Sequence, residues 1–123
     1  MFQNMLVAGF GGFFGTCVRF IVNKIVGNFS LFPVPLATFI VNLIGCFLFG
    51  LFVGWLEKSE FLSPSLYALL ITGFCGGLTT FSTFSNELFN LSSKGEIFVF
   101  LTYLICSILF GILLIWAGRI CVR

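Results

Sequence analysis

Hydroxyl and aromatic side chains gather in one short segment of this 123-residue chain, Gly73–Phe84, which reads GFCGGLTTFSTF. The segment pairs two adjacent glycines with four hydroxyl residues, namely Thr79, Thr80, Ser82 and Thr83. Hydroxyl groups donate hydrogen bonds, and aromatic ring edges carry partial positive charge, so together they can hold a small anion without a fixed cation. The alternative is ordinary aromatic packing, because the chain contains 19 phenylalanines.

The same segment also predicts an interruption of its helix. Adjacent glycines each lose roughly 1 kcal/mol of helix propensity, and hydroxyl side chains can cap the backbone where a helix restarts. We therefore predict a break near residues 76–80. Its free carbonyl groups suit a hard cation, and its free amide groups suit an anion. After the restart, Phe81 and Phe84 share one helix face, while Thr80, Thr83 and Glu87 lie on a neighbouring one.

Three further polar side chains lie within or beside apolar sequence. Asn42 is about ten residues into its apolar stretch, at a depth where polar groups are costly. It either forms an interhelical hydrogen bond worth about 1 kcal/mol or offers an amide donor to a permeation path. Arg19 either reaches the membrane surface with its long side chain or attracts anions at a vestibule. For Glu87, near the opposite interface, we favour a structural role.

The elements that must position these groups follow from composition. Hydrophobic residues make up 59% of the chain and charged residues 8%, whereas soluble domains carry about a quarter charged residues. All charges lie outside four stretches, 1–18, 32–56, 61–86 and 97–118. Each stretch is long enough as a helix to cross a hydrocarbon core of about 30 Å. We predict an all-α integral membrane protein with one domain, 1–123, and approximate spans 2–22, 32–56, 63–90 (broken near 76–80) and 97–118.

Composition also excludes several chemistries. The chain has no histidine and only four acidic residues, which removes histidine relays and most zinc sites. Its five cysteines form no CxxC pair and are interpreted as packing residues. No nucleophile and base can be assembled, so we expect no catalytic residue and no enzyme activity. A net charge of +2 does not indicate a nucleic-acid partner.

The distribution of basic residues leaves the orientation open. Four spans place Lys58, Arg119 and Arg123 on one side of the membrane, and Lys24, Lys94 and, if it reaches the surface, Arg19 on the other. Orientation depends on an excess of Lys and Arg on the cytoplasmic side, and here that excess is zero or one. Either another determinant sets the topology, or both orientations insert and pair as an antiparallel dimer.

Small residues at four-residue spacing suggest how the helices assemble. Four helices barely enclose a solvated path, so we expect transport to require an oligomer. The contact surfaces that the sequence offers are Gly11 and Gly15; Cys46, Gly50 and Gly54; and Gly73 and Gly77. Such spacing allows helix backbones to approach closely.

Three blocks of sequence together resemble the CrcB/Fluc family of small fluoride channels. They are Gly11–Phe20 (GGFFGTCVRF), Thr38–Gly50 (TFIVNLIGCFLFG) and Gly73–Phe84. The blocks occur in the family's order and cover essentially the whole chain. The first block departs slightly, with Thr16 where alanine is expected and Phe20 where tyrosine is expected.

This resemblance implies an antiparallel, dual-topology homodimer in the cell membrane that exports fluoride by passive electrodiffusion through two pathways. It also implies a structural sodium ion at the dimer centre. Carried onto this sequence, the resemblance assigns Asn42, Phe81, Ser82, Thr83 and Phe84 to the ion pathway, Arg19 to a vestibule, and the backbone carbonyls of Gly76 and Thr79 to sodium.

Two rival functions remain at this stage. A small multidrug-type proton antiporter also has four helices, but it needs a carboxylate within the first helix, and this chain has none there. A purely structural membrane subunit would need only the packing glycines. The density of polar groups at the predicted break argues against that second alternative.

Overall fold

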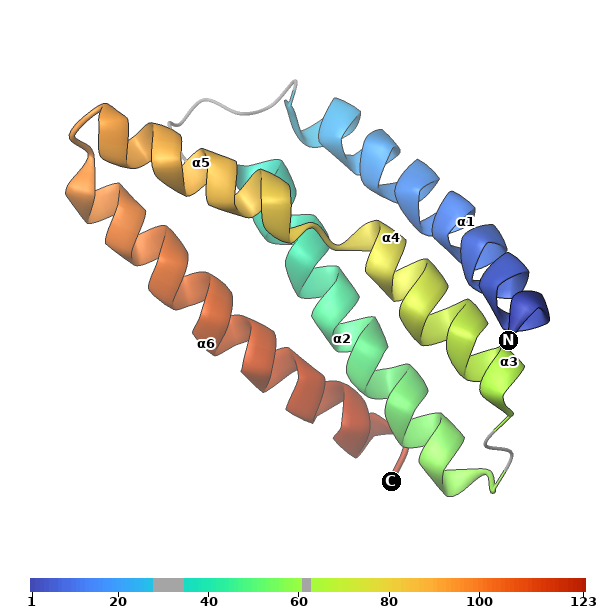
Figure 1. Cartoon of the computed structure of the whole chain (residues 1–123). Coiled ribbons are helices and arrows are strands. Elements are labelled where there is room, and N and C mark those ends of the chain that lie inside the picture. The colour runs from blue at the N-terminus through green and yellow to red at the C-terminus, as the bar shows by residue number, and fades with distance from the viewer. Residues whose placement is uncertain (28–34, 61–62) are drawn as a thin grey trace.

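The computed structural model describes residues 1–27, 35–60 and 63–123 and folds them into helices (Figure 1). In chain order these are α1 (Phe2–Gly27), α2 (Leu36–Lys58), α3 (Pro64–Tyr67), the π-helix η1 (Ala68–Cys75), α4 (Gly76–Leu78), α5 (Phe81–Ser93) and α6 (Ile97–Cys121). α3 begins with Ser63, whose side chain accepts a hydrogen bond from the Leu66 N–H, and with Pro64 in the first turn.

Four of the helical segments are long and apolar enough to cross a membrane: Phe2–Gly27, Leu36–Lys58, Pro64–Ser93 and Ile97–Cys121. The fold class predicted from composition is therefore confirmed as all-helical with four candidate spans. The first and last helices extend several residues beyond the predicted spans. Residues 32–34 of the predicted second span lie outside the described residues.

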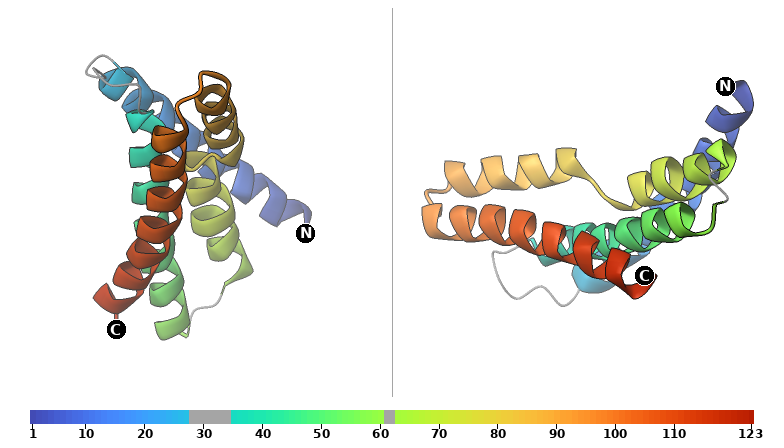
Figure 2. Two further views of the ribbon diagram at one scale, coloured as in Figure 1. Left: turned by 90° about the vertical axis from the view of Figure 1, so that its left-hand side faces the viewer. Right: turned by 90° about the horizontal axis from the view of Figure 1, so that it is seen from below.

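The third span, Pro64–Ser93, has two halves with different neighbours. The first half, Pro64–Leu78, runs along α1, whereas the second half, Phe81–Ser93, lies beside α6 (Figure 2). The residues between them are extended, with φ −85° and ψ 156° at Thr79, and φ −147° and ψ 118° at Thr80. The predicted break is thus present at Thr79–Thr80.

Of the two predicted causes of the break, capping by a hydroxyl is present at Thr80, whereas the expected break at the glycines was wrong. Gly76 keeps helical angles, φ −63° and ψ −36°, and Gly77 lies within α4. A Cβ atom on Gly77 would lie 2.6 Å from the Gly12 carbonyl oxygen of α1. The second glycine therefore permits close helix packing, and the chain leaves the helix only at the threonines that follow.

Other glycines allow α1 to pack closely against the first half of the third span. A Cβ atom on Gly11 or Gly15 would collide with the backbone of Leu69 or Phe74, and one on Gly73 with the Ala8 carbonyl. Each helix therefore approaches the other where a side chain is missing.

The helices α2 and α6 use glycine in the same way. A Cβ atom on Gly50 would strike the Ile115 backbone, and one on Gly118 would strike the backbone of Phe47. The spacing of these small residues was expected to supply contacts in an oligomer. Gly11, Gly15, Gly50, Gly73 and Gly77 instead form contacts within one chain, because a single bundle already needs these close approaches.

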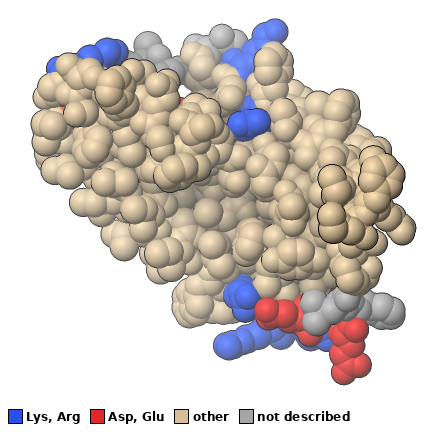
Figure 3. Space-filling model, viewed as in Figure 1, with Lys and Arg blue, Asp and Glu red and all other residues tan. Residues whose placement is uncertain are grey.

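Both chain termini lie at one end of the bundle, together with the last turn of α2 and the start of α3 (Figure 1). Basic side chains occur at both ends of the molecule, and uncharged surface separates them (Figure 3). This arrangement agrees with four membrane crossings and with an even distribution of Lys and Arg.

Candidate functional site

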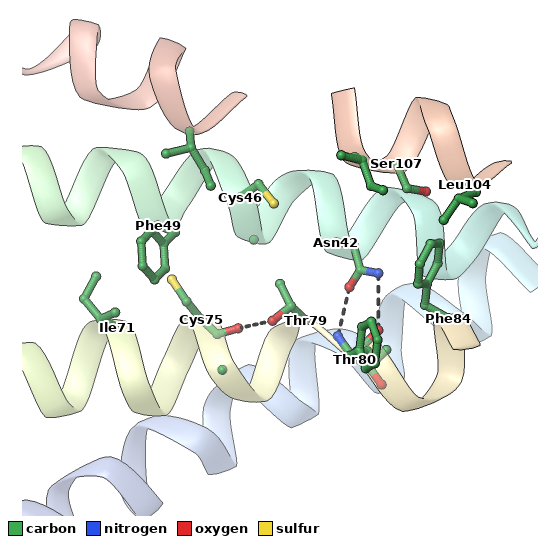
Figure 4. A pocket seen from close by; sticks show the side chains of 15 residues that line it. Asn42, Cys46, Phe49, Ile71, Cys75, Thr79, Thr80, Phe84, Leu104 and Ser107 are labelled. Atoms are coloured by element: carbon green, nitrogen blue, oxygen red, sulfur yellow. Dashed lines mark hydrogen bonds between the residues drawn. The ribbon is translucent and has the colours of Figure 1, made fainter. Parts of the chain in front are cut away.

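A cavity of about 500 Å³ opens where α2, the third span and α6 meet, beside the break (Figure 4). Most of its wall is apolar, from residues such as Phe49, Ile71 and Leu104. Its polar side chains are Asn42, Thr79, Thr80 and Ser107, with the thiols of Cys46 and Cys75. No lysine, arginine or acidic residue occurs among these described lining residues, so any ion there would meet neutral donors only.

Asn42 is bonded to the break itself. Its Oδ1 accepts a hydrogen bond from the Thr80 N–H at 2.9 Å, and its Nδ2 donates to the Thr80 carbonyl at 3.3 Å (Figure 4). Because the oxygen must face an N–H, this pairing fixes which way the amide points. An amide has two N–H donors, and the second one has no partner among the hydrogen bonds of the described residues. The interhelical hydrogen bond expected as one alternative is therefore present, and one donor remains at the cavity wall.

Thr80 begins the second half of the third span. Its Oγ1 accepts a hydrogen bond from the Thr83 N–H at 3.3 Å, which caps the N-terminus of α5. The same hydroxyl lies 3.1 Å from Thr83 Oγ1 and 3.4 Å from Ser82 Oγ. Three hydroxyl groups are thus gathered at the positive end of the α5 dipole.

The helix before the break ends with free acceptors. Both the N–H and the hydroxyl of Thr79 donate hydrogen bonds to the Cys75 carbonyl, at 3.0 and 2.9 Å. The Thr80 N–H, which would otherwise reach the Gly76 carbonyl, donates to Asn42 instead. Within the described part of the chain, no interhelical or side-chain hydrogen bond ends on the carbonyls of Gly76 or Thr79. Such oxygens suit a hard cation.

The predicted aromatic pair lies at the cavity, but its members differ in exposure. Phe84 is 9% exposed and Phe81 is 80% exposed, with ring centroids 6.3 Å apart and planes at 47°. Ser82 and Thr83 lie on the exposed side of α5 and do not line the cavity. In a single chain, three of the five predicted pathway residues, Phe81, Ser82 and Thr83, are therefore exposed.

Glu87 accepts hydrogen bonds from two other helices. Its Oε1 accepts from the Thr38 hydroxyl of α2, and its Oε2 accepts from the Tyr103 hydroxyl of α6 at 3.3 Å. The Tyr103 ring in turn packs edge-on against Phe84, with centroids 5.0 Å apart. This geometry agrees with the structural role favoured for Glu87.

Sequence reasoning missed three residues at this site. Ser107 is the clearest, because its buried hydroxyl has no hydrogen-bond partner in the described residues and lines the cavity. It could have been found by the argument used for Asn42, as a polar residue inside an apolar span. Thr38 and Tyr103 carried no comparable signal, since nothing in the sequence pairs them with Glu87. Arg19 lies on α1 and is absent from the cavity lining.

Comparison with known proteins finds matches over nearly all of the chain. The family model described as CrcB-like protein, Camphor Resistance (CrcB), matches residues 6–119. A fluoride-specific ion channel FluC of Flavobacterium psychrophilum is 40% identical over 118 residues, covering 96% of this chain and 95% of that protein. Proteins of the same name from Methanococcus aeolicus and Chlorobium phaeobacteroides are 42% and 45% identical, covering 96% and 95% of this chain and 94% and 91% of their own lengths.

Proposed function

This chain belongs to the CrcB family, and from that membership we propose how its own residues conduct fluoride. The protein is a fluoride-specific ion channel and a multi-pass membrane protein, and it is not an enzyme. Membership of this family therefore argues against the rival function, a proton antiporter with four helices. In the cell membrane such a channel lowers cytoplasmic fluoride by passive electrodiffusion.

The proposed pathway runs past the second N–H of Asn42, the ring edges of Phe81 and Phe84, and the hydroxyls of Ser82 and Thr83. The observation that carries this assignment is the Asn42–Thr80 pairing, which holds one amide donor at the wall of an apolar cavity without charged side chains. Neutral donors replace part of the water shell of fluoride without binding it too tightly for release. Ring edges add weak positive potential.

Ser107 extends this set of donors to α6. The residue lines the same cavity, and its hydroxyl is buried and lacks a protein partner among the described residues. An unpaired buried hydroxyl is costly, and rotation of this side chain toward the cavity would let an anion or water there satisfy it. We therefore add Ser107 to the residues of the proposed path.

The proposed assembly is an antiparallel homodimer of dual topology with two pathways. Two observations support it: basic residues are balanced between the ends of the bundle, and Phe81, Ser82, Thr83 and Gly76 lie on exposed surface. A second copy covering this surface would complete the wall that one chain leaves open. Reporter fusions at the C-terminus should show both orientations, whereas uniform orientation would contradict the dual topology.

A structural sodium ion is the proposed partner of the carbonyls of Gly76 and Thr79. The donor set fits, because both oxygens lack partners in the hydrogen bonds described above and face a break that needs satisfied acceptors. When bound between two copies, sodium would neutralise carbonyl charge and add positive potential near the anion paths. Buried water is the alternative occupant.

A sodium titration separates these occupants. With a bulky organic cation replacing sodium, dimer stability and fluoride flux should both fall if the ion is structural. Equal stability and flux after exhaustive removal of sodium would favour water.

Arg19 is proposed to attract anions at a vestibule, and Arg19→Gln should then lower flux more at low salt than at high salt.

The proposed function is tested by fluoride efflux from liposomes that contain only this purified chain. We expect rapid fluoride efflux that needs no pH gradient, with little chloride efflux from matched liposomes. Empty liposomes provide the baseline. Flux that requires a proton gradient would contradict passive conduction.

A further inference from the structure

We infer that Tyr103 is a positioning residue for the fluoride path, because it fixes the plane of the Phe84 ring and is itself held by Glu87 and Thr38. The inference rests on the proposed role of Phe84. It gives Tyr103, Glu87 and Thr38 a shared task that none of them performs by touching the ion.

The first step concerns the Phe84 ring. Only the edge of an aromatic ring attracts an anion, so the ring plane decides whether Phe84 helps or repels fluoride. The terminal torsion of phenylalanine is broad and does not set that plane. Neighbouring atoms must set it, and Tyr103 is the aromatic neighbour with the shortest centroid distance, 5.0 Å at 69°. Phe81 lies farther away, at 6.3 Å, and is largely exposed.

The second step concerns what holds Tyr103. The residue is 3% exposed, and its hydroxyl donates to Glu87 Oε2 at 3.3 Å. A buried tyrosine hydroxyl needs a partner, so the place of that partner decides where the ring lies. Tyr103 and Phe84 belong to one apolar cluster with Leu91, and Leu88, Val99 and Leu104 pack against it.

The third step concerns Glu87. Its other oxygen accepts from Thr38 of α2, so both carboxylate oxygens are engaged, each by a hydroxyl from a different helix. Glu87 and Phe84 are three residues apart on α5, within one turn of the same helix. The helix that presents the ring is thus also the helix that anchors Tyr103. Because the hydroxyls of Thr38 and Tyr103 point at Glu87, they are not available as donors to fluoride.

Two substitutions of Tyr103 separate its hydroxyl from its ring. Tyr103→Phe keeps the ring and should lower fluoride flux about threefold, the size expected from one hydrogen bond, whereas Tyr103→Leu should lower it about tenfold or more. The fluoride-to-chloride flux ratio should fall in the same order. Tyr67→Phe is the matched control, since Tyr67 is half-exposed on α3 and outside the cavity lining. A folded Tyr103→Leu channel with the flux and ratio of the parent would overturn the inference.

Glu87 supplies the conservative rescue. Glu87→Gln retains a carbonyl acceptor for Tyr103 and should keep more flux than Glu87→Ala. Combining Glu87→Ala with Tyr103→Phe should add little to either change alone, because both cut the same connection. Fully additive losses would show that the two residues act separately, against the inference.

A spectroscopic readout does not depend on conduction. With 4-fluorophenylalanine placed at position 84, the ¹⁹F resonance should shift or broaden in Tyr103→Leu and in Glu87→Ala, but not in Tyr67→Phe. An unchanged resonance in Tyr103→Leu would overturn the inference. If the parent chain failed to conduct fluoride, the proposed function would fail, and this resonance would still decide whether Tyr103 positions Phe84.

Discussion

The two halves of the third span are held in place by different forces. The first half, Pro64–Leu78, packs backbone against backbone on α1, through glycines on both helices. The second half, Phe81–Ser93, is tied to α2 and α6 by side-chain hydrogen bonds of Asn42 and Glu87. Close backbone packing therefore holds the first half, whereas the second half adds these polar contacts to an apolar cluster around Phe84, Leu91 and Tyr103. The candidate ion site lies at the junction, where the second N–H of Asn42 has no partner among the hydrogen bonds of the described residues.

The largest effect is expected from filling a glycine contact of the first half. In Gly15→Val, the added carbons would collide with the backbone of Phe74 and Leu78. We expect destabilisation of about 3 kcal/mol or more, or no folded protein, because backbone cannot move aside as a side chain can. The measurements are thermal melting and the yield of folded protein in detergent.

Gly9→Val is the matched control for this change. Gly9 lies on the same helix, and nothing would lie within 4 Å of its added Cβ. Melting of Gly15→Val at the temperature of Gly9→Val would show that close approach does not hold the first half.

The next largest effect is expected at the junction. Asn42→Asp keeps an acceptor for the Thr80 N–H but loses the donors to the Thr80 carbonyl and to the cavity. It also adds negative charge beside the proposed anion path. Loss of a hydrogen bond to a charged group costs about 1.5–3 kcal/mol, so fluoride flux in liposomes should fall about tenfold or more.

Asn90→Asp provides the same chemical change at an exposed position of α5 and should conduct like the parent. Unchanged efflux from folded Asn42→Asp would remove Asn42 from the pathway. Loss of folding in Asn42→Asp alone would show that the junction is mainly a structural contact.

A smaller effect is expected at the start of the second half. Thr80→Val removes the hydroxyl that caps α5 while keeping the shape of the side chain. The expected cost is about 1 kcal/mol, and it should appear as faster hydrogen exchange of the Thr83 N–H. Thr102→Val, at an exposed position of α6, is the control. Equal protection of Thr83 in both variants would argue that the cap does not hold this half.

The halves also differ in how far sequence could predict them. Composition predicted four spans, and the glycine and threonine pattern predicted a break within a few residues of Thr79–Thr80, because both signals are local. Spacing predicted that Gly11 and Gly15 form a contact face, but spacing does not show which helix packs against that face. The first half of the third span, and not a second subunit, covers them.

The polar contacts were harder to predict, because their partners are distant in sequence. Asn42 and Thr80 are 38 residues apart, and Thr38 and Glu87 are 49 apart. The family resemblance supplied residue names at the break, but it did not predict that Asn42 pairs with the Thr80 backbone. That contact depends on the path of the chain after it leaves the helix, which only tertiary structure determines.

The smallest effect is expected from the polar contact of the first half. The Ser65 hydroxyl donates to Asn4 Oδ1 of α1 at 3.0 Å, at the end of the bundle near the chain terminus. If glycine packing holds this half, Ser65→Ala should cost at most about 0.5 kcal/mol, the low end for one hydrogen bond, since water near the membrane surface can replace the lost partner. Ser93→Ala, at an exposed position ending α5, is the control in thermal melting. If Ser65→Ala lost as much stability as Thr80→Val, side-chain hydrogen bonds would matter equally in both halves. The two halves would then differ only in their glycine contacts.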